Sequence, residues 1–215
     1  MKACALRLCL LLCVSAALAI PSAAQILYDN GPINGTVDGW LITGEIIANT
    51  FTISSGPSTV TGLSFGAWLF PGDVLENADV WISSGAFGGT TYFNQAVNFT
   101  QSGCSTNQYG YNVCTETGAF NGPTLMNGTY WLNLGNAVVN NGDPVYWDEN
   151  SGIGCSSPGC PSESVNNIEG TEPSEAFTVL GTSSSGTGST PEPASLMLFA
   201  SGVLALGGIV RRKIL

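Results

Sequence analysis

The stretch between Gln25 and Leu180 has no helical hydrophobic period. Short runs rich in Val, Ile, Thr and aromatic residues alternate there with Gly, Asn, Ser and Pro, a pattern typical of strands and turns. Asn-Gly pairs at residues 30–31, 34–35, 121–122, 127–128 and 141–142 favour turns with positive φ. The sequence therefore predicts an all-β fold, an antiparallel β-sandwich of jelly-roll-like topology. The predicted strands are 26–29, 46–53, 59–69, 78–83, 92–94, 96–100, 129–134, 145–147 and 176–180.

This predicted domain, residues 25–180, is long enough to bury a sizeable hydrophobic core. Aromatic side chains bury the largest apolar areas. We expect the core to be built largely from Phe51, Phe65, Trp68, Trp81 and Trp131.

Basic residues are confined to the two ends of the chain. The five are Lys2, Arg7, Arg211, Arg212 and Lys213, and there is no His. Fourteen of the 15 acidic residues fall within residues 25–190, which contain no base, so this stretch has a net charge of −14. Such a surface repels phosphate backbones and excludes nucleic-acid binding. Catalytic triads, Cys-His pairs, Schiff-base lysines and Walker loops are excluded with it.

Residues 1–24 have the three parts of a secretory signal peptide. Lys2 and Arg7 precede the apolar run 8–20, and the small residues 22–24 follow. A helix over 8–20 would cover only about 20 Å of a hydrocarbon core about 30 Å thick, so a retained membrane helix is disfavoured. We expect signal peptidase to leave Gln25 as the new N-terminus.

The C-terminal segment also has three parts: Pro191-Glu192-Pro193, an apolar stretch over 194–210, and the basic cluster Arg211-Arg212-Lys213. The apolar stretch is at the lower limit for a transmembrane helix. By the positive-inside rule the basic cluster stays in the cytoplasm, with residues 25–193 outside. An ordinary C-terminal membrane anchor is one interpretation of this pattern.

The same residues resemble the PEP-CTERM sorting signal of Gram-negative bacteria that make exopolysaccharide. In that family a membrane-embedded cysteine transpeptidase, exosortase, recognises the tripartite tail and processes the protein near Pro-Glu-Pro. The resemblance implies that Pro191, Glu192 and Pro193 form the recognition motif and that Arg211, Arg212 and Lys213 form the basic stop. It covers about a tenth of the chain and concerns sorting alone.

Residues 181–190, Gly-Thr-Ser-Ser-Ser-Gly-Thr-Gly-Ser-Thr, have the composition of a flexible linker. Such a linker would lift the domain from the membrane and leave residues 191–193 open to a processing enzyme.

Four cysteines remain after signal removal: Cys104, Cys114, Cys155 and Cys160. An even number in an exported chain indicates disulfides. Four cysteines allow three connectivities, of which we favour the nearest-neighbour pairing Cys104–Cys114 and Cys155–Cys160. A four-cysteine zinc site is the alternative, although the spacing of 104 and 114 fits it poorly.

Oxygen ligands gather between residues 143 and 150. Asp143, Asp148, Glu149 and Asn150 could bind Ca²⁺, although the spacing matches no EF-hand loop. The alternative is a plain solvated acidic loop. Apart from this calcium hypothesis we expect no cofactor.

Several aromatic residues could stack on sugar rings if strands expose them: Trp40, Tyr109, Tyr111, Tyr146 and Trp147. The alternative is that these rings belong to the core, as aromatic residues on strands usually do.

An enzyme would have to rely on carboxylates alone. Asp148 and Glu149 are adjacent, so on a strand they would point to opposite faces. We therefore expect a non-enzymatic structural or adhesive protein of the cell envelope or extracellular matrix. The alternative is a module that binds exopolysaccharide in the same location.

Overall fold

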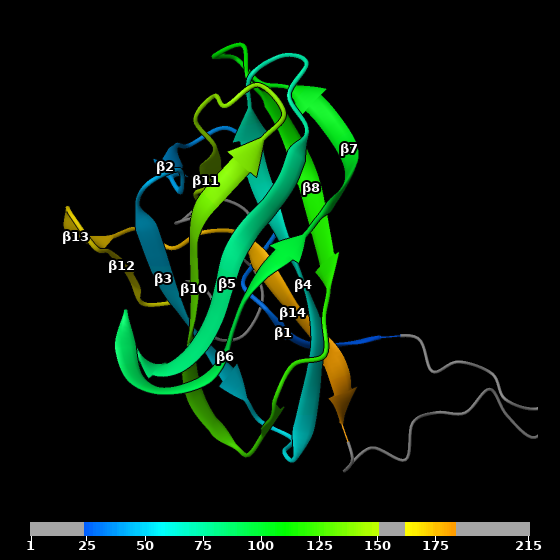
Figure 1. Ribbon diagram of the computed structural model, residues 1–215, viewed down its shortest axis with the longest axis vertical. Coiled ribbons are helices and arrows are strands. Elements are labelled where there is room, and N and C mark those ends of the chain that lie inside the picture. Colours follow the sequence, from blue (N-terminus) through cyan, green and yellow to red (C-terminus); the bar gives the residue numbers. More distant parts are fainter. Residues whose placement is uncertain (1–23, 151–161, 184–215) are drawn as a thin grey trace, which may run out of the picture.

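The computed structural model describes residues 24–150 and 162–183, and every regular element within them is a β-strand. These strands form two antiparallel sheets (Figure 1). No helix in the described ranges has the length and apolar character needed to cross a membrane. The predicted signal peptide, the predicted transmembrane helix over 194–210 and the sorting residues lie outside the described residues.

The first sheet has eight strands and is organised around β4, which pairs with β14 and β11 along one edge and with β8 and β9 along the other. Beyond these, β1 pairs with β14, β2 with β11, and β7 with β8. The strands are β1 (Gln25–Asp29), β2 (Gly39–Leu41), β4 (Ser58–Leu69), β7 (Thr100–Thr106), β8 (Asn112–Ala119), β9 (Thr124–Leu125), β11 (Tyr146–Asp148) and β14 (Phe177–Ser183).

The second sheet has six strands in the order β13-β12-β3-β10-β5-β6. They are β3 (Ile46–Ile53), β5 (Leu75–Gly85), β6 (Gly88–Asn98), β10 (Gly128–Val139), β12 (Ser164–Asn166) and β13 (Gly170–Glu172).

One hydrophobic core joins the two sheets. Successive side chains of a strand point to opposite faces, so β4 directs Phe65, Ala67 and Leu69 into the core, while β10 supplies Leu132 and Leu134 from the other sheet. All five are buried. The sheets therefore pack face to face, as in a sandwich.

Trp147 lies within this core and is fully buried. Its ring centroid is 5.9 Å from that of Phe65 and 5.6 Å from that of Phe177. The indole Nε1 donates a hydrogen bond of 3.0 Å to the carbonyl of Ala176. A buried Trp needs such a partner, because an unpaired N–H in an apolar environment is costly.

The eight strands β1, β3, β4, β5, β6, β8, β10 and β14 carry the main path of the chain. When they are numbered 1 to 8 in sequence, the sheets have the orders 1-8-3-6 and 2-7-4-5. The first and last strands are therefore neighbours, and every sheet pair is antiparallel.

Most predicted strands are confirmed, and residues 46–53 match β3 to the residue. The segments predicted at 92–94 and 96–100 are instead one strand through Asn98, followed by a new strand from Thr100. Strand β14 continues to Ser183, three residues into the segment predicted to be linker. Strand β8 was not predicted, because its sequence NVCTETGA contains few large apolar residues.

The predicted core is right for Phe51 and Phe65 and wrong for Trp81 and Trp131. The strand alternation explains the difference, because Ile82 and Leu132 point inward and leave the neighbouring tryptophans on the outer face, half-buried. Trp68 is buried, but it lies on the outer face of β4, opposite to Phe65.

Because Phe65 is fully buried between the sheets, we expect Phe65→Ala to lower the free energy of unfolding by about 3–5 kcal/mol. The matched control is Met126→Ala, a truncation of a side chain that is 61% exposed, which should change stability by less than about 0.5 kcal/mol. Chemical denaturation of the mature protein measures both. Equal losses in the two variants would contradict the assignment of the core.

Candidate functional site

Five aromatic side chains gather on the outer face of the first sheet, and we call them the aromatic cluster: Trp68, Phe70, Tyr109, Tyr111 and Tyr146. The ring of Tyr109 stacks on that of Trp68 with 5.7 Å between centroids and 25° between planes. Tyr111 has its centroid 5.8 Å from Trp68, 5.0 Å from Phe70 and 5.7 Å from Tyr146. Tyr109 is 56% exposed, whereas Trp68 is 4% exposed. The cluster therefore presents the exposed ring of Tyr109 and the half-buried rings of Phe70, Tyr111 and Tyr146 around the buried Trp68.

The turn between β7 and β8 places the two tyrosines. The side-chain Oδ1 of Asn107 accepts hydrogen bonds from the backbone N–H groups of Tyr109 and Tyr111, each at 3.0 Å. The backbone N–H of Asn107 in turn donates to the carbonyl of Tyr111 at 2.9 Å. Asn is well suited to such a turn, because its short side chain can bond to nearby backbone groups.

A buried carboxylate lies beneath the aromatic cluster. Asp148 is fully buried and accepts three hydrogen bonds: from Trp68 Nε1 at 2.6 Å, from the Asn34 backbone N–H at 2.8 Å and from the Gly35 backbone N–H at 2.9 Å. Burial raises the pKa of Asp148, while these donors act in the opposite direction. Asp148 thus fixes the Trp68 indole and holds the segment around Asn34 against the sheet.

Glycine at position 35 is needed for this contact. Its φ is +62°, in the left-handed region that other residues seldom adopt. A Cβ at this position would also lie 2.8 Å from Val113 Cγ2. The second predicted Asn-Gly turn, residues 34–35, therefore serves as a carboxylate-binding turn.

Glu149 is bonded to a different tryptophan. Its Oε2 accepts a hydrogen bond of 2.9 Å from Trp40 Nε1. Burial raises the pKa of Glu149, the bond from Trp40 lowers it, and the nearby Asp38 raises it further. Trp40 is half-buried and fixed by this bond.

A polar group is buried between the sheets near β12. Glu175 is fully buried, and its Oε2 accepts hydrogen bonds from Asn49 Nδ2 and from Ser164 Oγ, the latter at 2.8 Å. Its Oε1 receives no hydrogen bond from the described residues. Burial raises the pKa of Glu175 well above its ordinary value, against the effect of Asn49. The alternation of polar and apolar residues in the sequence does not predict the burial of Glu175, Asn49 and Ser164.

Two further buried carboxyls receive no hydrogen bond from any described residue: those of Glu116 and Glu172. Burial raises the pKa of Glu116 from 4.5 to about 7. It raises that of Glu172 from 4.5 to about 8, with further contributions from Glu169, Glu45 and Glu149. Both carboxyls therefore hold a proton at neutral pH to a far greater extent than an exposed Glu does.

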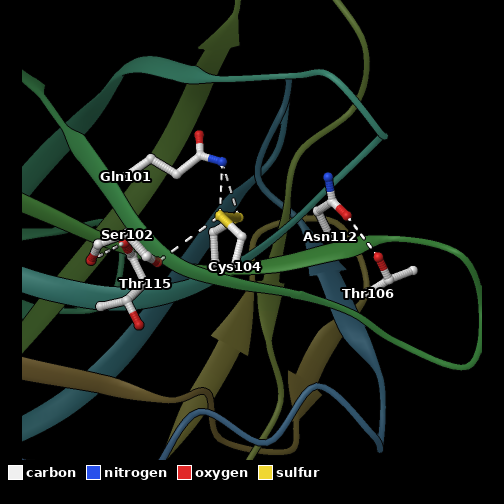
Figure 2. Close-up of a disulfide and its surroundings, with 7 residues drawn as sticks. Gln101, Ser102, Cys104, Thr106, Asn112 and Thr115 are labelled. Atoms are coloured by element: carbon white, nitrogen blue, oxygen red, sulfur yellow. Dashed lines mark hydrogen bonds between the residues drawn. A yellow bond between two sulfur atoms is a disulfide. The ribbon is translucent and has the colours of Figure 1, made fainter.

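The predicted disulfide Cys104–Cys114 is confirmed, with an S–S distance of 2.12 Å between the edge strand β7 and its neighbour β8. Figure 2 shows Gln101 beside it, with Nε2 3.0 Å from each sulfur. Cys114 is buried while Cys104 is exposed. Cys155 and Cys160 lie outside the described residues, so their pairing stays a prediction.

The residues predicted to bind sugar lie in different parts of the structure. Tyr109, Tyr111 and Tyr146 are gathered in the aromatic cluster, together with Trp68, which was assigned to the core. Trp147 is completely buried, so its ring is not open to a sugar. Successive side chains of β11 point to opposite faces, so Trp147 points into the core and Tyr146 points outward.

Two of the residues predicted to bind calcium already accept hydrogen bonds from tryptophan side chains. Asp143 is exposed, while Asp148 and Glu149 accept bonds from Trp68 and Trp40. Within residues 24–150 and 162–183, no three side chains of the His, Cys, Asp or Glu types are arranged to hold a metal ion. Calcium binding at Asp143, Asp148 and Glu149 stays a prediction.

Comparison with known proteins places one segment of the chain. Residues 189–213 match the family model of the PEP-CTERM protein-sorting motif. The match includes all six predicted sorting residues, from Pro191 to Lys213. No curated protein and no solved structure matches the chain.

Protonation of Glu116 predicts how stability depends on pH. Because folding raises the pKa of Glu116, the contribution of this group to the free energy of unfolding is greatest below about pH 4.5. That contribution is lost as the pH rises to about 7. The free energy of unfolding should fall with a slope of no more than about 1.4 kcal/mol per pH unit from this group. Glu116→Gln should remove that slope and be relatively more stable at pH 7 than at pH 4.5.

Denaturation curves recorded from pH 4.5 to 8 measure the effect. The exposed Glu163→Gln serves as a control with the same loss of a carboxylate and should retain the wild-type pH profile. If Glu116→Gln also followed the wild-type profile, Glu116 would not be a proton-binding group of the folded state.

Proposed function

We propose that this protein, an exported exosortase substrate by virtue of its PEP-CTERM motif, serves as a structural or adhesive component of the cell envelope or extracellular matrix. The observation that carries the proposal is the match of residues 189–213 to the sorting motif. A sorting signal defines the destination of a protein, and the β-domain is the part delivered there.

The topology belongs to the same proposal. Signal peptidase removes residues 1–24, and a helix over 194–210 holds the chain in the inner membrane with Arg211, Arg212 and Lys213 in the cytoplasm. Exosortase then acts near Pro191-Glu192-Pro193. The residues between Ser183 and Thr190 remain as a short linker rich in Gly, Ser and Thr.

The described domain suits a passive role outside the cell. A disulfide closes its β7–β8 hairpin, and a single apolar core joins the two sheets. A disulfide of this kind persists in oxidising compartments. With neither His nor any basic residue between positions 8 and 210, the proposed role is non-catalytic.

A second candidate function is binding of exopolysaccharide, and the aromatic cluster favours it. Aromatic faces in proteins offer flat apolar surfaces with polar edges, and Tyr109 presents such a face supported by Trp68. The strand orders 1-8-3-6 and 2-7-4-5 support a jelly roll, an architecture also used by lectin domains.

Charge defines the polysaccharide class for this second function. Residues 25–190 contain 14 acidic residues and no basic residue, and the resulting negative charge repels uronate, sulfate and other anionic sugars. The proposed ligand is therefore a neutral polysaccharide, or an anionic one bridged by divalent cations.

Intact-mass analysis tests the sorting proposal. In exosortase-positive cells the mature protein should begin at Gln25 and lack the basic terminus, because processing removes the segment after the Pro-Glu-Pro motif. Glu192→Ala should retain the C-terminal mass, while the control Glu163→Ala should be processed as the wild type. A wild-type product that still ends in its original C-terminus would contradict the sorting proposal.

Affinity electrophoresis in neutral polysaccharide tests the binding proposal. Tyr109→Ala should weaken binding by about five- to tenfold, since loss of one stacking contact is worth about 1–1.5 kcal/mol. The control is Tyr92→Ala, which removes a ring that is 42% exposed on β6 of the other sheet. Equal retardation of wild type and Tyr109→Ala would exclude the aromatic cluster as the binding surface.

A further inference from the structure

Two consecutive strands leave the sheets open on one side of the molecule. In the described residues β6 pairs only with β5, and β7 pairs only with β8, so each is the edge strand of its sheet. The outward backbone N–H and C=O groups of an edge strand are free to pair with another strand. We call this side of the sandwich, Gly88 to Thr106, the open flank.

Both edges belong to the same side of the sandwich. Val97 of β6 and Phe99 lie directly against β8, because a Cβ on Gly118 would come within 2.7 Å of Val97 Cγ1 and 2.8 Å of Phe99 Cε1. Figure 1 shows β7 beside β8 on the right, while β12 and β13 lie on the left. The free edges of β6 and β7 therefore lie next to each other on this flank.

The open flank carries no charge. From Val80 to Thr115 the sequence contains no Asp, Glu, Lys or Arg. Side chains exposed on β6 include Thr90, Asn94 and Gln95, which are polar and neutral. Charged side chains are one device by which proteins prevent edge-to-edge pairing, and this edge lacks them.

The opposite flank differs in this respect. Of its edge strands, β1 ends at Asp29, β2 directly follows Asp38, and β13 ends at Glu172. Two more acids lie beside them, Glu163 just before β12 and Glu169 in the turn between β12 and β13. In a domain with no basic residue these acids repel any second copy of the same chain. Self-pairing is therefore opposed at the edges of the opposite flank, and the uncharged strand β9 has only two residues to offer a partner.

Strand β6 is the more regular of the two open edges. Its register against β5 shifts between Ile82 and Ser83, beside Tyr92, and is continuous from Phe93 to Asn98. Strand β7 has an irregularity between Ser102 and Ser105, next to the disulfide at Cys104. Irregular pairing twists an edge away from a partner, so the segment from Phe93 to Asn98 is the best template.

We propose that the open flank is a self-association surface, at which β6 of one protomer pairs antiparallel with β6 of a second copy. The occupant is a second copy because a flank without charges of its own is where an identical acidic domain meets the least repulsion, the nearest acid being Asp79 on the neighbouring strand β5, opposite Ala96. Pairing of a strand with itself about a two-fold axis uses the same patch on both protomers. It extends the six-stranded sheet across the pair and closes as a dimer.

A charge-reversal pair tests this proposal. Gln95 is exposed and close to the middle of the regular segment, so either charge at this position would face its own copy across the axis. Gln95→Glu and Gln95→Lys should each raise the dimer dissociation constant at least tenfold in sedimentation of the mature protein. An equimolar mixture of the two variants should recover the dimer, because opposite charges then face each other.

The matched control is Thr171→Glu, which adds the same charge at an exposed position of β13 on the opposite flank. It should leave the dissociation constant within about twofold of the wild type. Hydrogen exchange of the wild type should show amides of residues 93–98 becoming protected as protein concentration rises. A wild type that sediments as a monomer across the concentration series, or variants that dimerise as it does, would overturn the proposal.

Discussion

The domain buries carboxyl groups in the absence of any side-chain cation. All basic residues lie in positions 1–7 or 211–215, while Glu116, Asp148, Glu149 and Glu175 are buried in the described residues. An ionised carboxylate without compensation is strongly destabilising in an apolar environment. Each buried acid must therefore be compensated by N–H and O–H donors or by a proton, and the structure uses both.

Donors and protons predominate in different parts of the molecule, and Glu175 uses both. Near the aromatic cluster, Asp148 and Glu149 are bound by indole and backbone N–H donors, which fix Trp68 and Trp40. Between the sheets, burial raises the pKa values of Glu116 and Glu175, and it does so for Glu172 at the edge. Apart from the buried Asp73, the other acids of the described residues are at least partly exposed, and those at the edges of the sheets repel a copy of the chain. One charge imbalance thus shapes the core, the candidate binding surface and the proposed self-association.

Strand periodicity predicted the larger elements because their signal is local. The alternation of residues 46–53 and 59–69 is visible in the sequence, whereas β8 is hidden by polar residues whose partners come from β4 and β7. The same limit explains the site: Tyr109, Tyr111 and Tyr146 were candidates, but the packing of Trp68 against them depends on a pairing across strands. For Trp147 the sequence leaves sugar binding and core burial as alternatives, because nothing local distinguishes the inward from the outward residue of a three-residue strand. The burial of Glu175 beside Asn49 depends on residues 126 positions apart.

The most direct measurement is a carbon-detected NMR titration of the glutamate carboxyl groups in the mature protein. If protons compensate the buried acids, Glu116 should titrate near 7 and Glu172 near 8, both far above the ordinary value of 4.5. The Glu175 carboxyl should also take up its proton well above that value. Titration of all three in the ordinary range of exposed glutamates would contradict the account, since the core would then hold uncompensated charges.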